Sequence, residues 1–133
     1  MATTDERLPI VGEGDIVRAR QRAREIAKGL GFGLVDQSRI ATAVSELTRN
    51  VVRYATGGKG DVSIKSLSGS GIEIVVSDHG PGIADVEQAL RDGFSSGAGM
   101  GMGLPGAKRL MDEMHVDSEL GSGTTVTIRK WRR

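Results

Sequence analysis

The chain of 133 residues has no cysteine and nearly balances its charges, with 18 basic and 17 acidic side chains. This length fits a single domain, 1–133, and the lack of cysteine excludes disulfides, thiolate metal sites and cysteine nucleophiles. Aromatic residues make up only 3% of the chain, too few for base-stacking surfaces, and there is no basic excess for nucleic acid. Because the sequence shows neither an apolar signal segment nor an apolar run of about 18 residues, we expect a cytoplasmic protein with no nucleic-acid or membrane partner.

The N-terminal third predicts a short strand followed by two amphipathic helices. Residues 1–7 are polar and are expected to be frayed, and residues 8–11 form a candidate strand. Asp15 is the expected N-cap of a first helix that ends at Gly29, and a second helix is expected to begin near Asp36. In both helices the apolar residues recur at intervals of three and four, as on the buried face of a helix. In the second helix these residues are Ile40, Val44, Leu47 and Val51.

Two hairpins are expected in the rest of the chain. The first pairs strands at 61–67 and 72–77, and the β-branched residues of the latter predict a central strand. The second pairs strands at 114–119 and 124–131, joined by a turn at Gly121-Ser122-Gly123.

Between the hairpins, residues 78–103 predict mostly loop with a short helix at 86–91, followed by a helix over 104–111. Pro105 is acceptable there because it falls in the first helical turn. This order of elements predicts an α/β (α+β) two-layer sandwich, in which helices cover one face of a mixed, mostly antiparallel sheet.

The familiar phosphate-binding motifs do not explain the glycine-rich region. The chain has no G-x-x-x-x-G-K-[ST] motif, so it has no Walker A site. Residues 101–106 match G-x-G-x-x-G, but a dinucleotide fingerprint needs a strand directly before it and a βαβ unit around it. Residues 94–97 show no strand pattern, so a Rossmann site is not expected.

Three features of the sequence suggest a binding or catalytic role, and the first is a set of polar residues on the second helix. Glu46 and Asn50 are four residues apart and therefore share one face, roughly 6 Å apart. Arg53 continues that face, away from the apolar stripe. A carboxylate that takes a proton, an amide oxygen that ligates a metal and a cation for phosphate would suit a nucleotide. The alternative is an ordinary solvent-facing helix surface.

A second feature is Asp78-His79-Gly80-Pro81-Gly82, directly after the central strand. The spaced glycines would let a flat ring approach the backbone closely, and the aspartate can accept a hydrogen bond from an exocyclic amine. The alternative is a plain turn, because the same residues are typical of turns.

The third feature is the run from Gly97 to Leu104, with glycine at every second position before a helix. Backbone amides in such a loop can wrap phosphates, and the positive end of the helix adds to their attraction. The alternative is a flexible loop, although alternating glycines exceed what flexibility requires.

Together these motifs resemble the GHKL superfamily, whose members bind ATP in the Bergerat fold. The resemblance starts at about residue 10 and extends over the rest of the chain. The matching residues are Glu46 and Asn50 in the N box; Asp78, Gly80 and Gly82 in the G1 box; Gly99, Gly101, Gly103 and Leu104 in the G2 box; and Gly121 to Thr125 in the last strand turn.

Within the superfamily the chain is similar to the small anti-sigma-factor kinases, of the stressosome switch-kinase type. This implies a serine/threonine protein kinase that phosphorylates a small STAS-domain antagonist, then binds and activates a PP2C-type phosphatase, within or beside a stressosome assembly. Two alternatives stay open: an anti-sigma factor or binding switch in which ATP is mainly structural, and a detached histidine-kinase ATPase domain.

The resemblance also implies roles for particular residues, with ATP and Mg²⁺ as the bound groups. Glu46 would be the catalytic base for the serine hydroxyl, and Asn50 would ligate Mg²⁺. Asp78 would accept from the adenine amine, with a bridging water held by Thr125. The implied ATP-binding residues are Asn50, Arg53, Asp78, Gly80, Gly82, Gly97, Gly99, Gly101, Gly103, Leu104 and Thr125.

Overall fold

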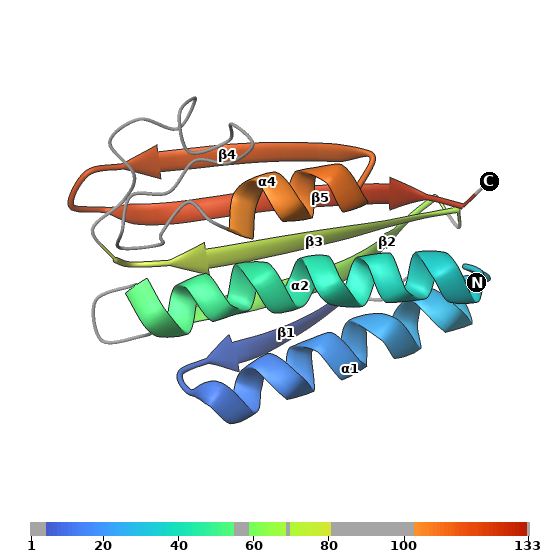
Figure 1. The fold of residues 1–133 in the computed structure, drawn as a ribbon, viewed down its shortest axis with the longest axis horizontal. Coiled ribbons are helices and arrows are strands. Elements are labelled where there is room, and N and C mark those ends of the chain that lie inside the picture. Colours follow the sequence, from blue (N-terminus) through green and yellow to red (C-terminus); the bar gives the residue numbers. More distant parts are fainter. Residues whose placement is uncertain (1–4, 55–58, 69, 81–102, 133) are drawn as a thin grey trace.

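The computed structural model describes residues 5–54, 59–68, 70–80 and 103–132 (Figure 1). In chain order its elements are β1 (Asp5–Ile10), α1 (Glu13–Gly29), α2 (Leu34–Tyr54), β2 (Gly60–Leu67), β3 (Gly71–Asp78), α4 (Gly103–Leu110), β4 (Glu113–Glu119) and β5 (Gly123–Trp131). The short helix expected at 86–91 lies outside the described residues.

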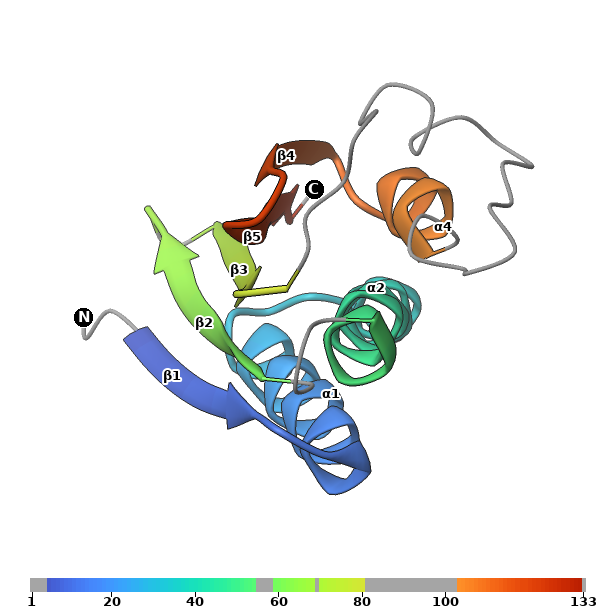
Figure 2. The same ribbon diagram turned by 90° about the vertical axis from the view of Figure 1, so that its left-hand side faces the viewer.

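The strands form one five-stranded sheet in the order β1-β2-β3-β5-β4. Each neighbouring pair in this order is antiparallel. Figure 2 shows α1, α2 and α4 together on one side of the curved sheet, with α2 between the other two. This arrangement confirms the two-layer α/β sandwich that the sequence predicts.

The core lies between the sheet and α2. Strand residues alternate between the two faces of a sheet. The buried apolar residues that β2, β3 and β5 turn toward the helices are Val62, Ile64, Ile72, Ile74, Val76, Val126 and Ile128. The predicted stripe of α2 packs among them, since Ile40, Val44, Leu47 and Val51 are all at most 2% exposed. The periodicity of the second helix is therefore confirmed, and it fixes which side of α2 remains available to a ligand.

Two predictions at the N-terminus are wrong. Residues 5–7 are not frayed but pair with β2, where the Arg7 guanidinium lies 3.6 Å from the Asp61 carboxylate. The N-cap of α1 is Gly12, not Asp15. Asp15 occupies the third helical position, from which its carboxylate accepts hydrogen bonds from the backbone N–H groups of Val11 and Gly12 at 2.9 and 3.1 Å.

The start of α2 is also two residues earlier than expected, at Leu34, so Asp36 lies in its first turn. Two hydrogen bonds from Gln37 stabilise the turn before this helix. The Gln37 backbone N–H donates to the Gly33 carbonyl at 2.9 Å, and the Gln37 side-chain amide donates to the Phe32 carbonyl at 2.8 Å.

The last residues of β5 are tied into the rest of the molecule. A Cβ added to Gly71 would lie 2.9 Å from Trp131 Nε1, so the indole ring covers that glycine on the neighbouring strand. The Arg132 N–H donates to the Ser70 carbonyl at 2.7 Å. The end of β5 is therefore fixed to the start of β3 and to the residue just before it.

Candidate functional site

Glu46 and Asn50 lie in the second half of α2, where both residues are half-buried. The Glu46 side chain is 38% exposed, and Arg49 Nη1 donates to Glu46 Oε1 at 3.1 Å. Arg53, one turn beyond Asn50, is exposed. The helix thus presents a carboxylate and an amide that a ligand can reach, with a cation beyond them.

Helix α4 begins directly against this pair. A Cβ added to Gly103 would lie 3.1 Å from Asn50 Nδ2 and 3.1 Å from the Glu46 carbonyl oxygen, a separation tighter than most real Cβ contacts. The next residue, Leu104, is 2% exposed and belongs to the core. The end of the predicted glycine loop is therefore anchored by Leu104, with its backbone beside Glu46 and Asn50.

Asp78 ends β3, and its side chain is organised by two backbone amides. Its Oδ1 accepts from the N–H of Gly80 at 2.8 Å and from the N–H of Thr124 at 3.3 Å. Within the described parts of the chain, both of these bonds are made to Oδ1, which leaves the second oxygen, Oδ2, for a ligand. Gly123 crosses close to this residue, because an added Cβ would lie only 2.1 Å from the Asp78 carbonyl oxygen.

The end of β3 and the second half of α2 lie at the same end of the molecule (Figure 1). Gly60 connects them: it pairs with Asp78 in the sheet, and a Cβ at this position would lie 2.8 Å from Val51 Cγ1. Val51 directly follows Asn50 in α2. The sequence-predicted groups at Glu46, Asn50, Asp78 and Gly103 are therefore gathered at one end of the fold.

The structure directs the Thr125 side chain to the face of the sheet opposite the helices, and the contact to Asp78 is made by its neighbour Thr124. The Thr125 hydroxyl lies 3.3 Å from Ser77 Oγ, and both side chains are on the face of the sheet that the helices do not cover. Thr124 is on the helix-facing side, 6% exposed, and its N–H reaches Asp78. Sequence reasoning missed Thr124, although the apolar residues at 126 and 128 and strand alternation indicate that 124 faces the helices.

A hollow of about 540 Å³ opens on the uncovered face of the sheet. Four of its lining residues, Asp61, Ser77, Thr125 and Asp117, form one row across the strands β2, β3, β5 and β4. Asp78 and Thr124 also line this hollow, whereas Glu46 and Asn50 belong to a helix on the opposite face and do not.

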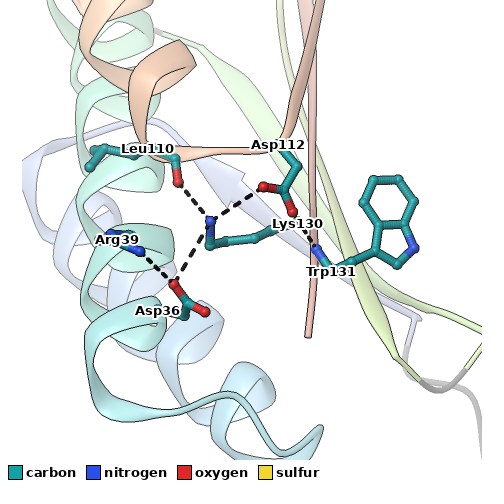
Figure 3. A network of polar contacts seen from close by, with 6 residues as sticks. All are labelled: Asp36, Arg39, Leu110, Asp112, Lys130 and Trp131. Carbon is teal, nitrogen blue, oxygen red and sulfur yellow. Dashed lines mark hydrogen bonds and ion pairs between the residues drawn. The ribbon is translucent and has the colours of Figure 1, made fainter. Parts of the chain in front are cut away.

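The other end of α4 is held by a buried lysine (Figure 3). Lys130 of β5 is 5% exposed, and its ammonium donates to the Leu110 carbonyl at 3.2 Å, at the last turn of α4. It also lies 3.8 Å from Asp36 Oδ1 of α2 and 3.7 Å from Asp112 Oδ1. Helix α4 is thus clamped at both ends, by Gly103 against α2 and by Lys130 beneath its C-terminus.

Four expected site residues, Gly82, Gly97, Gly99 and Gly101, lie outside the described residues. Gly80 is buried, and its N–H closes the turn onto Asp78. The arrangement that is described can orient a flat polar group at Asp78 and present a carboxylate and an amide beside the start of a helix.

Comparison with known proteins identifies the class. Residues 35–133 match the HATPase_c family, the histidine kinase-, DNA gyrase B-, and HSP90-like ATPases. The match spans well over half of the chain, so the chain belongs to this family of ATPases.

The relatives narrow that class further. Serine/threonine-protein kinase RsbT of Bacillus subtilis (strain 168) is 50% identical over 127 residues, covering 93% of this chain and 94% of the relative. This match over nearly the full length of both proteins places the chain among the serine/threonine-protein kinases of the family. An anti-sigma F factor of Thermoanaerobacter sp. (strain X514) is 38% identical over 97 residues, covering 69% of this chain and 68% of the relative.

A solved structure agrees on the fold. The RsbU and RsbW domains of Rv1364c from Mycobacterium tuberculosis match all of this chain with a TM-score of 0.65 and 22% identity, over 34% of that chain. No helix in the described part of the chain is both long and apolar enough to cross a membrane.

Proposed function

We propose that the protein is a cytoplasmic partner-switching serine kinase. It transfers phosphate from ATP to a serine of a small STAS-domain antagonist and then binds and activates a PP2C-type phosphatase in a bacterial stressosome pathway. The observation that carries this proposal is the position of Glu46 and Asn50, side by side on α2 against the start of α4, in a chain half identical to a serine/threonine-protein kinase.

The residues present fit ATP with Mg²⁺. Asp78 is held by two backbone amides and keeps one carboxylate oxygen for the adenine amine. Asn50 offers an amide oxygen, and Mg²⁺ typically takes only one or two protein ligands together with phosphate oxygens and water. Arg53 is exposed one turn further along α2 and would contact a phosphate. Bound Mg²⁺ would neutralise charge on the transferring phosphoryl group.

Glu46 would act as the base in the transfer. As the serine oxygen forms its bond to the γ-phosphorus and the bond from that phosphorus to the β–γ bridging oxygen breaks, the hydroxyl proton passes to the Glu46 carboxylate, and ADP leaves. Glu46 Oε1 is already oriented by Arg49, which leaves Oε2 to receive the proton. The base therefore needs little reorganisation before it acts.

The test is radiolabelled phosphate transfer to a purified STAS-domain partner from the same genome. Glu46→Gln should retain ATP binding but lose transfer, whereas Asn50→Ala should lose both. Glu13→Gln, which changes an exposed carboxylate at the start of α1, is the matched control and should transfer normally. A wild-type chain that binds ATP and does not label the partner would contradict the kinase proposal.

A second candidate function is that of an anti-sigma factor in which ATP is mainly structural. The similarity to the anti-sigma F factor favours it. Pull-down with the alternative sigma factors of the same genome separates the two candidates, because the switch kinase should capture the phosphatase and no sigma factor.

A further inference from the structure

We infer that Ser118 is a specificity-determining residue, which fixes the direction of the Thr124 hydroxyl so that the base site accepts an amino group and rejects a carbonyl oxygen. The inference rests on the proposed function, in which the Asp78 carboxylate accepts a hydrogen bond from the adenine amine. Ser118 belongs to β4 and would act on the nucleotide through Thr124.

The hydrogen-bond geometry assigns the protons. Ser118 Oγ lies 3.2 Å from the Gly123 carbonyl oxygen and 2.8 Å from Thr124 Oγ1. A carbonyl oxygen only accepts, and a hydroxyl has a single proton to donate. The Ser118 proton is therefore used by the Gly123 carbonyl, and the bond between the two hydroxyls must run from Thr124 to Ser118. The opposite direction would place two acceptors 3.2 Å apart with no proton between them.

The hairpin holds these groups in place. Ser118 and Thr124 are paired across β4 and β5, and the turn between the strands is closed by the Ser122 N–H donating to the Glu119 carbonyl at 3.0 Å. Gly123 has a φ of +108°, a conformation that side chains disfavour, and it lies against the Asp78 backbone. The hydroxyl pair therefore has a fixed register beside Asp78.

The consequence is a site lined with acceptors. Thr124 donates its hydroxyl proton to Ser118 and its backbone N–H to Asp78 Oδ1. Its side chain therefore offers only lone pairs to a ligand. The ionised Asp78 carboxylate likewise offers only lone pairs. An adenine amino group supplies two N–H donors to such a site, directly or through a water. The O6 of guanine in the same position would meet acceptors alone, and an unpaired polar group lowers affinity.

Removal of the Ser118 hydroxyl should relax this selectivity. In Ser118→Ala the Thr124 hydroxyl loses its acceptor and is able to rotate and donate to a bound carbonyl oxygen. Titration calorimetry with MgATP and with MgGTP measures the ratio of the two dissociation constants. We expect the preference for ATP to narrow by about three- to tenfold, the range that one neutral hydrogen bond spans. Ser118→Thr keeps a hydroxyl and should keep the wild-type ratio.

Two further variants separate a specificity role from a structural one. Ser122→Ala changes an exposed hydroxyl in the same turn and should leave the ratio unchanged. Thr124→Val removes the group through which Ser118 acts, so the Ser118→Ala/Thr124→Val double variant should bind both nucleotides as Thr124→Val does. A folded Ser118→Ala variant with an unchanged ratio, or additive effects in the double variant, would overturn the inference while leaving ATP binding intact. A wild-type chain that binds neither nucleotide would overturn the proposed function and this inference with it.

Discussion

Gly103 begins α4 in contact with Asn50, the proposed magnesium ligand: a Cβ on Gly103 would lie 3.1 Å from Asn50 Nδ2. The same position lies 3.1 Å from the Glu46 carbonyl and 3.2 Å from Glu46 Cβ. The entry to α4 and the polar pair of α2 are thus set by one another, and the absence of a side chain at residue 103 allows it.

Gly103→Ala should therefore weaken ATP binding. The added methyl group would press on the Asn50 amide and on the α2 backbone, which has little room to yield. We expect the dissociation constant for MgATP, measured by calorimetry, to rise by about tenfold, the equivalent of about 1.4 kcal/mol.

The control for this substitution lies in the same helix. Gly106→Ala adds the same methyl group where nothing lies within 4 Å, so it should leave ATP affinity unchanged and stabilise the fold by about 0.4–1 kcal/mol through the unfolded state. Equal losses of affinity in the two variants would show that the contact at Gly103 is not the cause.

Lys130→Met should destabilise the protein by removing the clamp beneath α4. The substitution leaves the Leu110 carbonyl without its ammonium donor, but Asp36 keeps Arg39 at 3.0 Å and Asp112 keeps the Trp131 N–H at 2.8 Å. Because both carboxylates retain partners, we expect a loss of about 2–4 kcal/mol in the free energy of unfolding, at or below the cost of breaking a buried ion pair. Urea denaturation measures it, and Lys108→Met, at an exposed position of α4, should lose less than about 0.5 kcal/mol.

Asp15→Ala should cost about 1 kcal/mol, the usual cost of losing a helix-capping interaction. The hydrogen bond from the Val11 N–H, with further contributions from Arg18 and Gly12 that outweigh burial, holds the pKa of Asp15 below its ordinary value. Its contribution is therefore present above the ordinary pKa of an aspartate and is lost as the pH falls through the lowered one. Glu13→Ala, in the same helical turn, should change the free energy of unfolding by only a few tenths of a kcal/mol.

Glu73, on the uncovered face of the sheet, should make a second acid-sensitive contribution to the free energy of unfolding. Burial opposes its ionisation, but hydrogen bonds from Arg129 at 2.7 Å and from Lys65 outweigh burial and hold the pKa of Glu73 below its ordinary value of 4.5. Glu73→Gln should therefore be less stable than the wild type at pH 7 by about 1 kcal/mol, a modest value because Lys65 and Arg129 remain exposed.

The pH dependence checks the sign of the Glu73 effect. As the pH falls below 4.5 and through the lowered pKa, Glu73 of the wild type takes up its proton and the two proteins should converge in free energy of unfolding. The control is Glu113→Gln, which changes an exposed carboxylate that also lies beside Arg129. A difference between wild type and Glu73→Gln that persists unchanged at pH 2 would contradict an ionic origin.

Most of the fold could be predicted from the sequence because its signals are local. The apolar stripe of α2 and the β-branched run of β3 each specify one element by its period. The extension of β1 to residue 5 could not be predicted in this way, because Asp5 and Arg7 have no strand signal of their own and are ordered by pairing with β2. The N-cap of α1 was misplaced because an acidic residue at the third helical position of a capping box resembles an acidic cap.

The site shows the same division between local and long-range information. Glu46, Asn50 and Asp78 stand in motifs that can be read directly, whereas the choice between Thr124 and Thr125 depends on which face of β5 meets the helices. The alternation of Val126 and Ile128 carries that information. The lysine clamp of α4 could not be predicted, because it joins residues 36, 110 and 130 of α2, α4 and β5 with residue 112 of the turn after α4.

The position of β5 has a consequence for how the protein is made. This strand is the last in the described chain, yet it lies between β3 and β4 and carries both Thr124 and Lys130. A nascent chain halted at residue 122 has α2 and its polar pair, but it lacks the Thr124 N–H that reaches Asp78 and the Lys130 ammonium that reaches the last turn of α4. The nucleotide site is therefore complete only after β5 has been synthesised and has inserted between β3 and β4.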